Sequence, residues 1–224
     1  MFTNKFTTMK TSKYLLIIGL VFLFTGSQVL AQQPSAKKEY KFTIKANPLA
    51  ALGGPFWVII VPITGEYKLI GEYAFAKQMS FQLGASYIGP SVLINLDKIA
   101  DTASVSGIKT SGLRFSGMLK YFLSRDLPAP QGFYIAPQFS FAKASLTNKK
   151  DPTQKVNAQK ININACIGYQ LITSGGFTLD IFTGMGYVKR DWSFEGNNTS
   201  TIFDLGKNKR GVSIPLGFSF GYAF

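Results

Sequence analysis

Seven charged side chains fall inside segments of the chain in which apolar residues alternate with small or polar ones. These residues are Lys45, Glu66, Lys68, Glu72, Arg114, Lys120 and Asp180. Successive side chains of a β-strand point to opposite faces, and all seven charges fall on the polar face. Four bases against three acids are close to electrical balance, so ion pairs among them would offset the cost of removing charge from water. The chemistry that this set predicts is charge pairing inside a closed structure.

Catalytic and metal-binding chemistry has little support in the sequence. The chain contains no histidine, which excludes Ser-His-Asp and Cys-His catalysis and histidine metal sites. Its single cysteine, Cys166, cannot form an internal disulfide. Three scattered acids, Asp97, Asp101 and Glu195, lack the spacing of a calcium-binding loop. We therefore expect no enzyme activity, no cofactor and no metal ion.

The elements that must position the charges are β-strands. After residue 31 we find no apolar segment of helical period and useful length, whereas eight segments show period two. They span about 40–52, 63–76, 79–88, 108–123, 132–143, 160–173, 176–189 and 212–224. Short connections at 77–78, 124–131 and 174–175 alternate with long ones near 53–62, 89–107, 144–159 and 190–210. This pattern predicts an all-β protein, an eight-stranded antiparallel up-and-down transmembrane β-barrel with both termini at the short-turn end.

The size of the side chains decides which face of such a barrel points outward. One face of each strand carries bulky aromatic and aliphatic residues, and the other is rich in Gly, Ser, Ala and Asn. An eight-stranded barrel is just wide enough for side chains to fill it, so the bulky face should contact lipid and the small, polar face should line the lumen. A soluble sandwich that buries the bulky faces between two sheets is the alternative. The lumen charges would then act either as a salt-bridge plug, which the narrow interior favours, or as the gate of a small pore.

The last strand ends the chain on an aromatic residue. Between Val212 and Phe224, apolar residues alternate with Ser213, Pro215 and other small residues. Phe220, Tyr222 and Phe224 form the apolar end of this strand. This is the pattern of the closing strand of a bacterial outer-membrane barrel.

The first 31 residues predict a cleaved secretory signal peptide, with residues 32–224 as the barrel. Lys10 and Lys13 precede a short apolar run at 14–24, and a polar exit ends at Ala31. The run is about half the length of a membrane-spanning helix, which needs roughly 20 apolar residues. Met9 is an alternative start, because residues 1–8 add nothing to the leader. Export to the outer membrane of a Gram-negative cell is the localisation that we expect.

The chain carries a formal net charge of +13 and therefore favours an anionic neighbour. Nucleic acid is an unsuitable partner for an exported chain, which leaves phosphorylated lipid headgroups. The predicted long loops hold a cationic set suited to lipopolysaccharide phosphates, with ordinary solvated loop charge as the alternative: Lys149, Lys150, Lys155, Arg190, Lys207, Lys209 and Arg210.

The leader, the eight amphipathic strands and the terminal Phe224 resemble small outer-membrane barrels of the OmpA-like and OmpW-like type. The segment Lys45-Ala46-Asn47-Pro48-Leu49, followed by Gly65-Glu66-Tyr67 and the strand at 80–87, also resembles the opening of an uncharacterised Bacteroidota barrel family, DUF3575. The resemblance implies an outer-membrane barrel and assigns no activity to particular residues. It also implies that Phe220, Tyr222 and Phe224 are read by the barrel-assembly machinery.

These observations together predict a monomeric, non-enzymatic outer-membrane β-barrel with a structural or surface-interaction role. A narrow pore or transporter for a small solute is the alternative function. Conduction through the lumen would separate the two.

Overall fold

The structure is a computed structural model, and it describes residues 39–52, 57–58, 61–62, 64–91, 108–195 and 209–224. The main strands are β1 (Phe42–Asn47), β4 (Gly65–Ala76), β5 (Met79–Gly89), β6 (Ile108–Phe122), β7 (Gly132–Asn148), β8 (Lys155–Ile172), β9 (Phe177–Glu195), β10 (Lys209–Ser213) and β11 (Leu216–Ala223). A short pair, β2 (Trp57–Val58) and β3 (Val61–Pro62), and one 3-10 helix, η1 (Pro48–Ala51), complete the elements. No helix of the described residues is long and apolar enough to cross a membrane.

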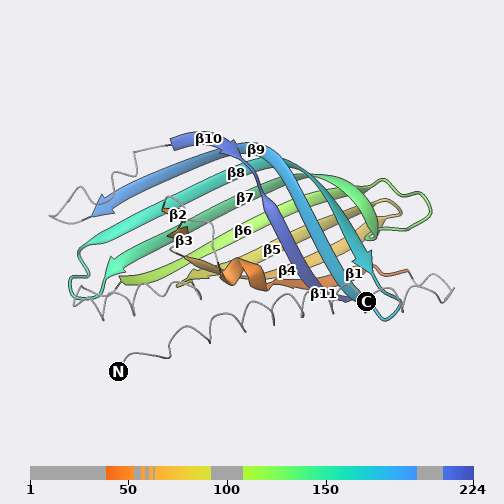
Figure 1. Ribbon diagram of the computed structural model, residues 1–224, viewed down its shortest axis with the longest axis horizontal. Coiled ribbons are helices and arrows are strands. Elements are labelled where there is room, and N and C mark those ends of the chain that lie inside the picture. The colour runs from red at the N-terminus through yellow and green to blue at the C-terminus, as the bar shows by residue number, and fades with distance from the viewer. Residues whose placement is uncertain (1–38, 53–56, 59–60, 63, 92–107, 196–208) are drawn as a thin grey trace, which may run out of the picture. The chain divides into compact units, whose positions relative to one another are not determined.

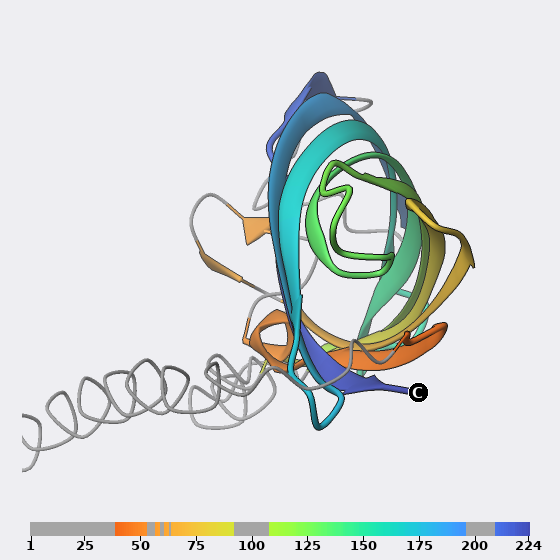
Figure 2. The same ribbon diagram turned by 90° about the vertical axis from the view of Figure 1, so that its right-hand side faces the viewer.

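The main strands form one closed antiparallel sheet (Figures 1 and 2). Each strand from β4 to β9 pairs with the next, and β11 joins β9 to β1. β10 and β11 share a single register on β9, in which Ser213 faces Gly186 and Leu216 faces Thr183. They are therefore one strand that is interrupted at Ile214 and Pro215. The structure confirms the predicted fold, an eight-stranded antiparallel barrel.

The burial of the side chains confirms the predicted assignment of the two faces. Large apolar residues on the outer face are exposed, as at Leu216 (84%) and Met185 (65%). Their inward neighbours are buried, and Lys45 and Asp180 are 1% and 0% exposed. The barrel therefore carries its apolar surface outside and its polar side chains inside.

Several strands are longer than the alternation of apolar residues predicts. β7, β8 and β9 contain 17, 18 and 19 residues, and the turn between β7 and β8 spans only 149–154. The first strand is shorter than predicted and ends at Asn47, not at residue 52. There the Asn47 side chain accepts a hydrogen bond from the Ala50 backbone amide at 3.1 Å, and Pro48 occupies the first turn of η1, where no amide donor is needed.

At the end of the barrel that carries the short turns, backbone hydrogen bonds join the first strand to the last and one connection to another. The carbonyl of Phe224 accepts a hydrogen bond from the Lys41 amide at 3.0 Å, so the first and last strands meet here. The connection between β6 and β7 is fixed by a 2.8 Å hydrogen bond from the Ala129 amide to the Lys77 carbonyl. Phe122 and Tyr134, each fully buried, fill the lumen at this level. Next to this apolar layer, the inner face carries the buried charged residues Lys45, Glu72, Lys120 and Asp180.

Candidate functional site

Four of the lumen charges form one compact ionic cluster, here called the plug: Lys45, Glu72, Lys120 and Asp180. The Lys45 ammonium lies 2.6 Å from Glu72 Oε2 and 2.7 Å from Asp180 Oδ2. The Lys120 ammonium contacts the same two oxygen atoms, at 3.3 and 2.7 Å. All four side chains have no exposed surface. Two positive and two negative groups therefore share a closed ring of contacts across the lumen.

Neutral polar groups complete the hydrogen bonding of the plug. Gln170 Oε1 accepts hydrogen bonds from Lys45 at 3.0 Å and from Lys120 at 2.7 Å. Gln82 Oε1 accepts from Lys45 at 2.8 Å, and the Tyr134 hydroxyl donates to Asp180 Oδ1 at 2.7 Å. Ser80 donates to the second oxygen of Glu72. Buried charges are tolerated when they are paired and their remaining hydrogen-bonding capacity is used, and the plug meets both conditions.

The plug is assembled from strands that are far apart in sequence. Its members come from β1, β4, β6 and β9, each at an inward position. Glu72 and Lys120 lie on the two neighbours of β5, and Asp180 reaches them from the other side of the barrel. The Lys120 ammonium also lies 4.4 Å from the centre of the Tyr134 ring, a cation–π contact. The plug therefore joins opposite walls of the barrel directly.

The remaining predicted lumen charges lie apart from the plug, in a second group. Arg114 Nη1 lies 2.8 Å from Glu66 Oε2, and Arg114 Nη2 donates to the Ser140 hydroxyl at 3.1 Å. The Ser86 hydroxyl donates to the other Glu66 oxygen at 2.7 Å. No carboxylate lies within 4 Å of the Lys68 ammonium in the part of the chain that the structure describes. The second group therefore has a surplus of positive charge.

The strand register aligns further basic residues with this second group. Successive register partners from β4 to β9 are Lys68, Ser86, Arg114, Ala142, Lys160 and Arg190. We name Lys68, Arg114, Lys160 and Arg190 the basic row. Every member sits at an inward position of its strand, and the two intervening positions are small. Glu66 forms an ion pair with Arg114 of the row, with 2.8 Å between Oε2 and Nη1.

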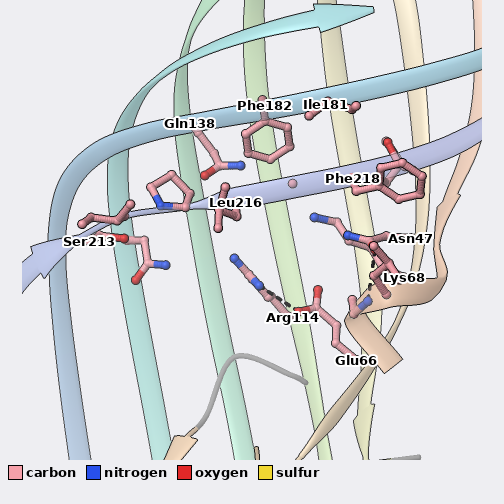
Figure 3. A pocket seen from close by; sticks show the side chains of 18 of the residues that line it. Asn47, Glu66, Lys68, Arg114, Gln138, Ile181, Phe182, Ser213, Leu216 and Phe218 are labelled. Atoms are coloured by element: carbon pink, nitrogen blue, oxygen red, sulfur yellow. Dashed lines mark hydrogen bonds and ion pairs between the residues drawn. The ribbon is translucent and has the colours of Figure 1, made fainter. Parts of the chain in front are cut away.

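A cavity of about 580 Å³ lies beside the basic row (Figure 3). Lys68, Arg114, Lys160 and Glu66 line its polar side. Its other side is formed where β10 meets β11, by residues that include Ser213, Pro215 and Leu216. In Figure 3 the Arg114–Glu66 ion pair faces the strand that carries Ser213 and Leu216. The lumen is therefore filled at the plug and hollow at the basic row.

The alternation of residues placed seven charges on the inner face but missed Lys160 and Arg190. Lys160 stands at the start of the predicted strand 160–173, two residues before the inward Asn162, so the same parity identifies it. Arg190 was assigned to a loop, and the structure places it within β9. The signal for Arg190 was weak because its outward neighbours Lys189 and Asp191 are polar, which removes the apolar alternation there. Before Lys160, the outward Gln159 is polar as well.

The cationic set predicted for long loops is distributed over several elements. Lys149 and Lys150 are exposed in the β7–β8 turn. Lys155 begins β8, Arg190 lies inside β9, and Lys209 and Arg210 begin β10, so these four belong to strands and not to loops. The strands extend further than the sequence pattern shows, which is the reason for this correction. Lys207 lies outside the described residues, as does the predicted signal peptide.

The three residues of the predicted assembly signal share the outer face of β11 and the chain end. Phe220, Tyr222 and Phe224 are 41, 48 and 59% exposed. The rings of Tyr222 and Phe224 pack edge to face with centroids 5.1 Å apart. This places an aromatic patch on the outside of the barrel at its short-turn end.

Comparison of the chain with protein-family models and with curated protein sequences gave no match. Function must therefore be argued from the barrel itself. In the described residues no group of three or more acidic or cysteine side chains is placed to hold a metal ion.

Proposed function

We propose that this protein is an exported outer-membrane β-barrel that does not conduct and that has a structural or surface-interaction role. The observation that carries the proposal is the plug. Four fully buried charged side chains, bonded across the lumen at 2.6–3.3 Å, leave no exposed surface at that level. An apolar layer around Phe122 and Tyr134 backs them toward the short-turn end.

The outer surface supports a membrane location. On β7 the outward residues of 133–141 are apolar or proline, and Lys143, Ser145 and Thr147 follow on the same face. At roughly 3.3 Å per residue this apolar part covers about 30 Å of strand. A tilted strand needs 9–11 residues to cross the hydrocarbon layer. A soluble barrel with this apolar surface on its outside would leave it in water, which is unfavourable.

Beyond the apolar part of β7, the outer surface of the barrel becomes polar and basic, which supports contact with anionic lipid. The exposed Lys149 and Lys150 lie in the turn at this end of the barrel. We assign this end to the cell surface, where lipopolysaccharide phosphates would be the anionic partner. The exposed aromatic patch of Phe220, Tyr222 and Phe224 supports recognition by the barrel-assembly machinery at the other end.

Conductance in planar bilayers tests the proposal. The purified barrel, shown to be folded by its heat-dependent mobility on gels, should give no reproducible single-channel steps. The matched variant Lys120→Ala/Asp180→Ala removes one charge of each sign from the plug and should raise the conductance above that of the wild type. Reproducible channels of the wild-type protein would overturn the proposal in favour of a narrow pore. Recovery of the protein in the soluble fraction would overturn the membrane location.

A further inference from the structure

The barrel wall has an interruption beside the cavity. β1 contains only six residues and pairs with Lys68–Tyr73 of β4 and with Phe220–Ala223 of β11. The described residues of β4 before Lys68, and those of β10 and β11 before Phe220, have no strand partner on the side of β1. The chain after Asn47 turns into η1 in place of continuing the ladder. Among the described residues, the seam between the first and last strands is therefore joined only near the short-turn end.

The cavity extends through this interruption. It is lined on the η1 side by Asn47 and Leu49 and on the opposite side by Ile214, Pro215 and Leu216. Leu49, Ile214 and Leu216 are 52, 70 and 84% exposed on the outer, apolar surface. The same cavity reaches Lys68, Arg114 and Lys160 inside the barrel. It thus connects an apolar outer surface with a basic inner surface (Figure 3).

Two polar groups at the inner end of the cavity have unused bonding capacity. The Lys68 ammonium makes no ion pair in the described part of the chain. Asn162, which also lines the cavity, is only 5% exposed, and its Oδ1 atom has no hydrogen-bond partner. A buried polar atom without a partner is unfavourable, so the site is suited to a bound polar group. An uncharged donor on the ligand would satisfy Asn162, and an anionic group would satisfy Lys68.

We propose that this cavity binds an anionic single-chain amphiphile, with its headgroup against Lys68, Arg114 and Lys160 and its hydrocarbon tail leaving the barrel between η1 and the β10–β11 strand. The proposal rests on the membrane location proposed above. Lys68 and Arg114 against Glu66 favour an anionic headgroup, and a hydroxyl group on such a headgroup would donate to Asn162 Oδ1. The exposed apolar residues at the interruption favour a tail that remains in the bilayer. The plug closes the lumen on the short-turn side of the cavity, and the interruption in the wall gives the ligand a route from the bilayer.

A water-soluble anion fits these observations less well. It would use the basic surface but not Leu49, Ile214 or Leu216, which open onto the side of the barrel. A neutral lipid would use those apolar residues but leave the surplus positive charge unbalanced. Only a ligand with both parts accounts for both ends of the cavity.

Binding of the fluorescent fatty acid 11-(dansylamino)undecanoate to the folded full-length barrel in neutral maltoside micelles tests the proposal. The wild type should raise the probe fluorescence, and oleate should displace the probe. Oleyl alcohol and inorganic phosphate should each compete at least about tenfold less well, because each lacks one half of the ligand. If oleyl alcohol competes as well as oleate, the role of the basic row is overturned. If phosphate competes as well as oleate, the role of the hydrocarbon tail is overturned.

Variants connect the binding to this cavity. Lys68→Met should weaken probe binding about tenfold, as expected for the loss of one charge-assisted contact. Ser213→Trp should abolish it by filling the cavity. Lys143→Met, which removes an exposed lysine from the outer face of β7, is the matched control and should bind like the wild type. Equal affinity of Lys68→Met and Lys143→Met would overturn the site.

The outcomes also separate this proposal from the proposed function. A barrel that shifts with heat on gels and is found in the membrane, but binds no probe, would overturn the amphiphile site alone. A protein recovered in the soluble fraction would overturn the membrane location on which the site depends.

Discussion

Asp180 has the most connected side chain of the plug. Its Oδ2 atom accepts from Lys45 and Lys120, both at 2.7 Å, and its Oδ1 atom accepts from Tyr134. Replacing it would leave two buried ammonium groups facing Glu72 alone. Breaking a buried ion pair from one side is costly because the remaining charge is uncompensated.

We therefore predict that Asp180→Asn lowers the free energy of unfolding by about 3–5 kcal/mol. Urea titration of the folded barrel in lipid vesicles measures this change. Lys68→Gln is the matched control, because Lys68 is a lumen charge that makes no ion pair in the described residues. This variant should lower the free energy of unfolding much less. Adding Lys120→Gln to Asp180→Asn restores electrical balance and should recover part of the loss. If the losses of unfolding free energy in Asp180→Asn and in Lys120→Gln simply add in the double variant, the two side chains are not coupled and the prediction is contradicted.

The inward positions of the plug residues could be predicted from the sequence, but their contacts could not. Parity within each strand identified Lys45, Glu72, Lys120 and Asp180 as inward without any knowledge of the fold. It could not predict that these four meet, while Glu66 and Arg114 form a separate pair. That division depends on the stagger between neighbouring strands, which the pairing registers determine and which no single strand encodes.

At the scale of elements, closure depends on the contact between β1 and β11. Gly221 faces Lys45 in this pairing. A Cβ atom at position 221 would overlap the carbonyl oxygen of Ile44 and approach the Cα atom of Lys45. The absence of a side chain therefore lets the first and last strands approach closely at the level of the plug.

Gly221→Ala should reduce the fraction of protein that closes into a barrel. Heat-dependent gel mobility after refolding into vesicles measures this fraction. Gly71→Ala on the adjacent β4 is the control, because a Cβ atom there would lie 3.9 Å from Phe42 Cζ, an ordinary contact distance. Normal folding of the Gly221 variant would show that the two strands can separate at this point without loss of closure.

The existence of the strands was predictable, whereas their ends were not. Period two marked every main strand, since each presents bulky residues to the outside. The signal ended early on β7 and β8 because outward residues such as Ser145, Thr147 and Asn157 are polar, whereas the inward Ala144 and Ala158 are apolar. The six-residue length of β1 was also missed, because Pro48 continues the apolar alternation of Phe42, Ile44 and Ala46 although the backbone turns into η1.

At the scale of the whole molecule, the start of β1, the end of β11 and the short turns lie at one end of the barrel. The hydrogen bonds of Phe224 to β1 and of Ala129 to Lys77 bring these parts together. The proposed location then requires the β7–β8 turn, at the opposite end, to face the outside of the cell.

Labelling of single cysteines on intact cells tests this orientation. In a Cys166→Ser background, a cysteine at Lys149 should react with an impermeant maleimide, and a cysteine at Lys77 should react only after the cells are lysed. Both positions are exposed, so their reactivity reports location and not burial. The reverse labelling pattern would contradict the orientation.

The balance of charges in the plug has a consequence for the response of the barrel to voltage. Displacing one net elementary charge across a membrane involves about 2.3 kcal/mol per 100 mV. Lys45 and Lys120 together with Glu72 and Asp180 carry no net charge, so an electric field does no net work when the four move as a unit. An applied potential should therefore leave the plug in place, unlike a gate that carries a net charge.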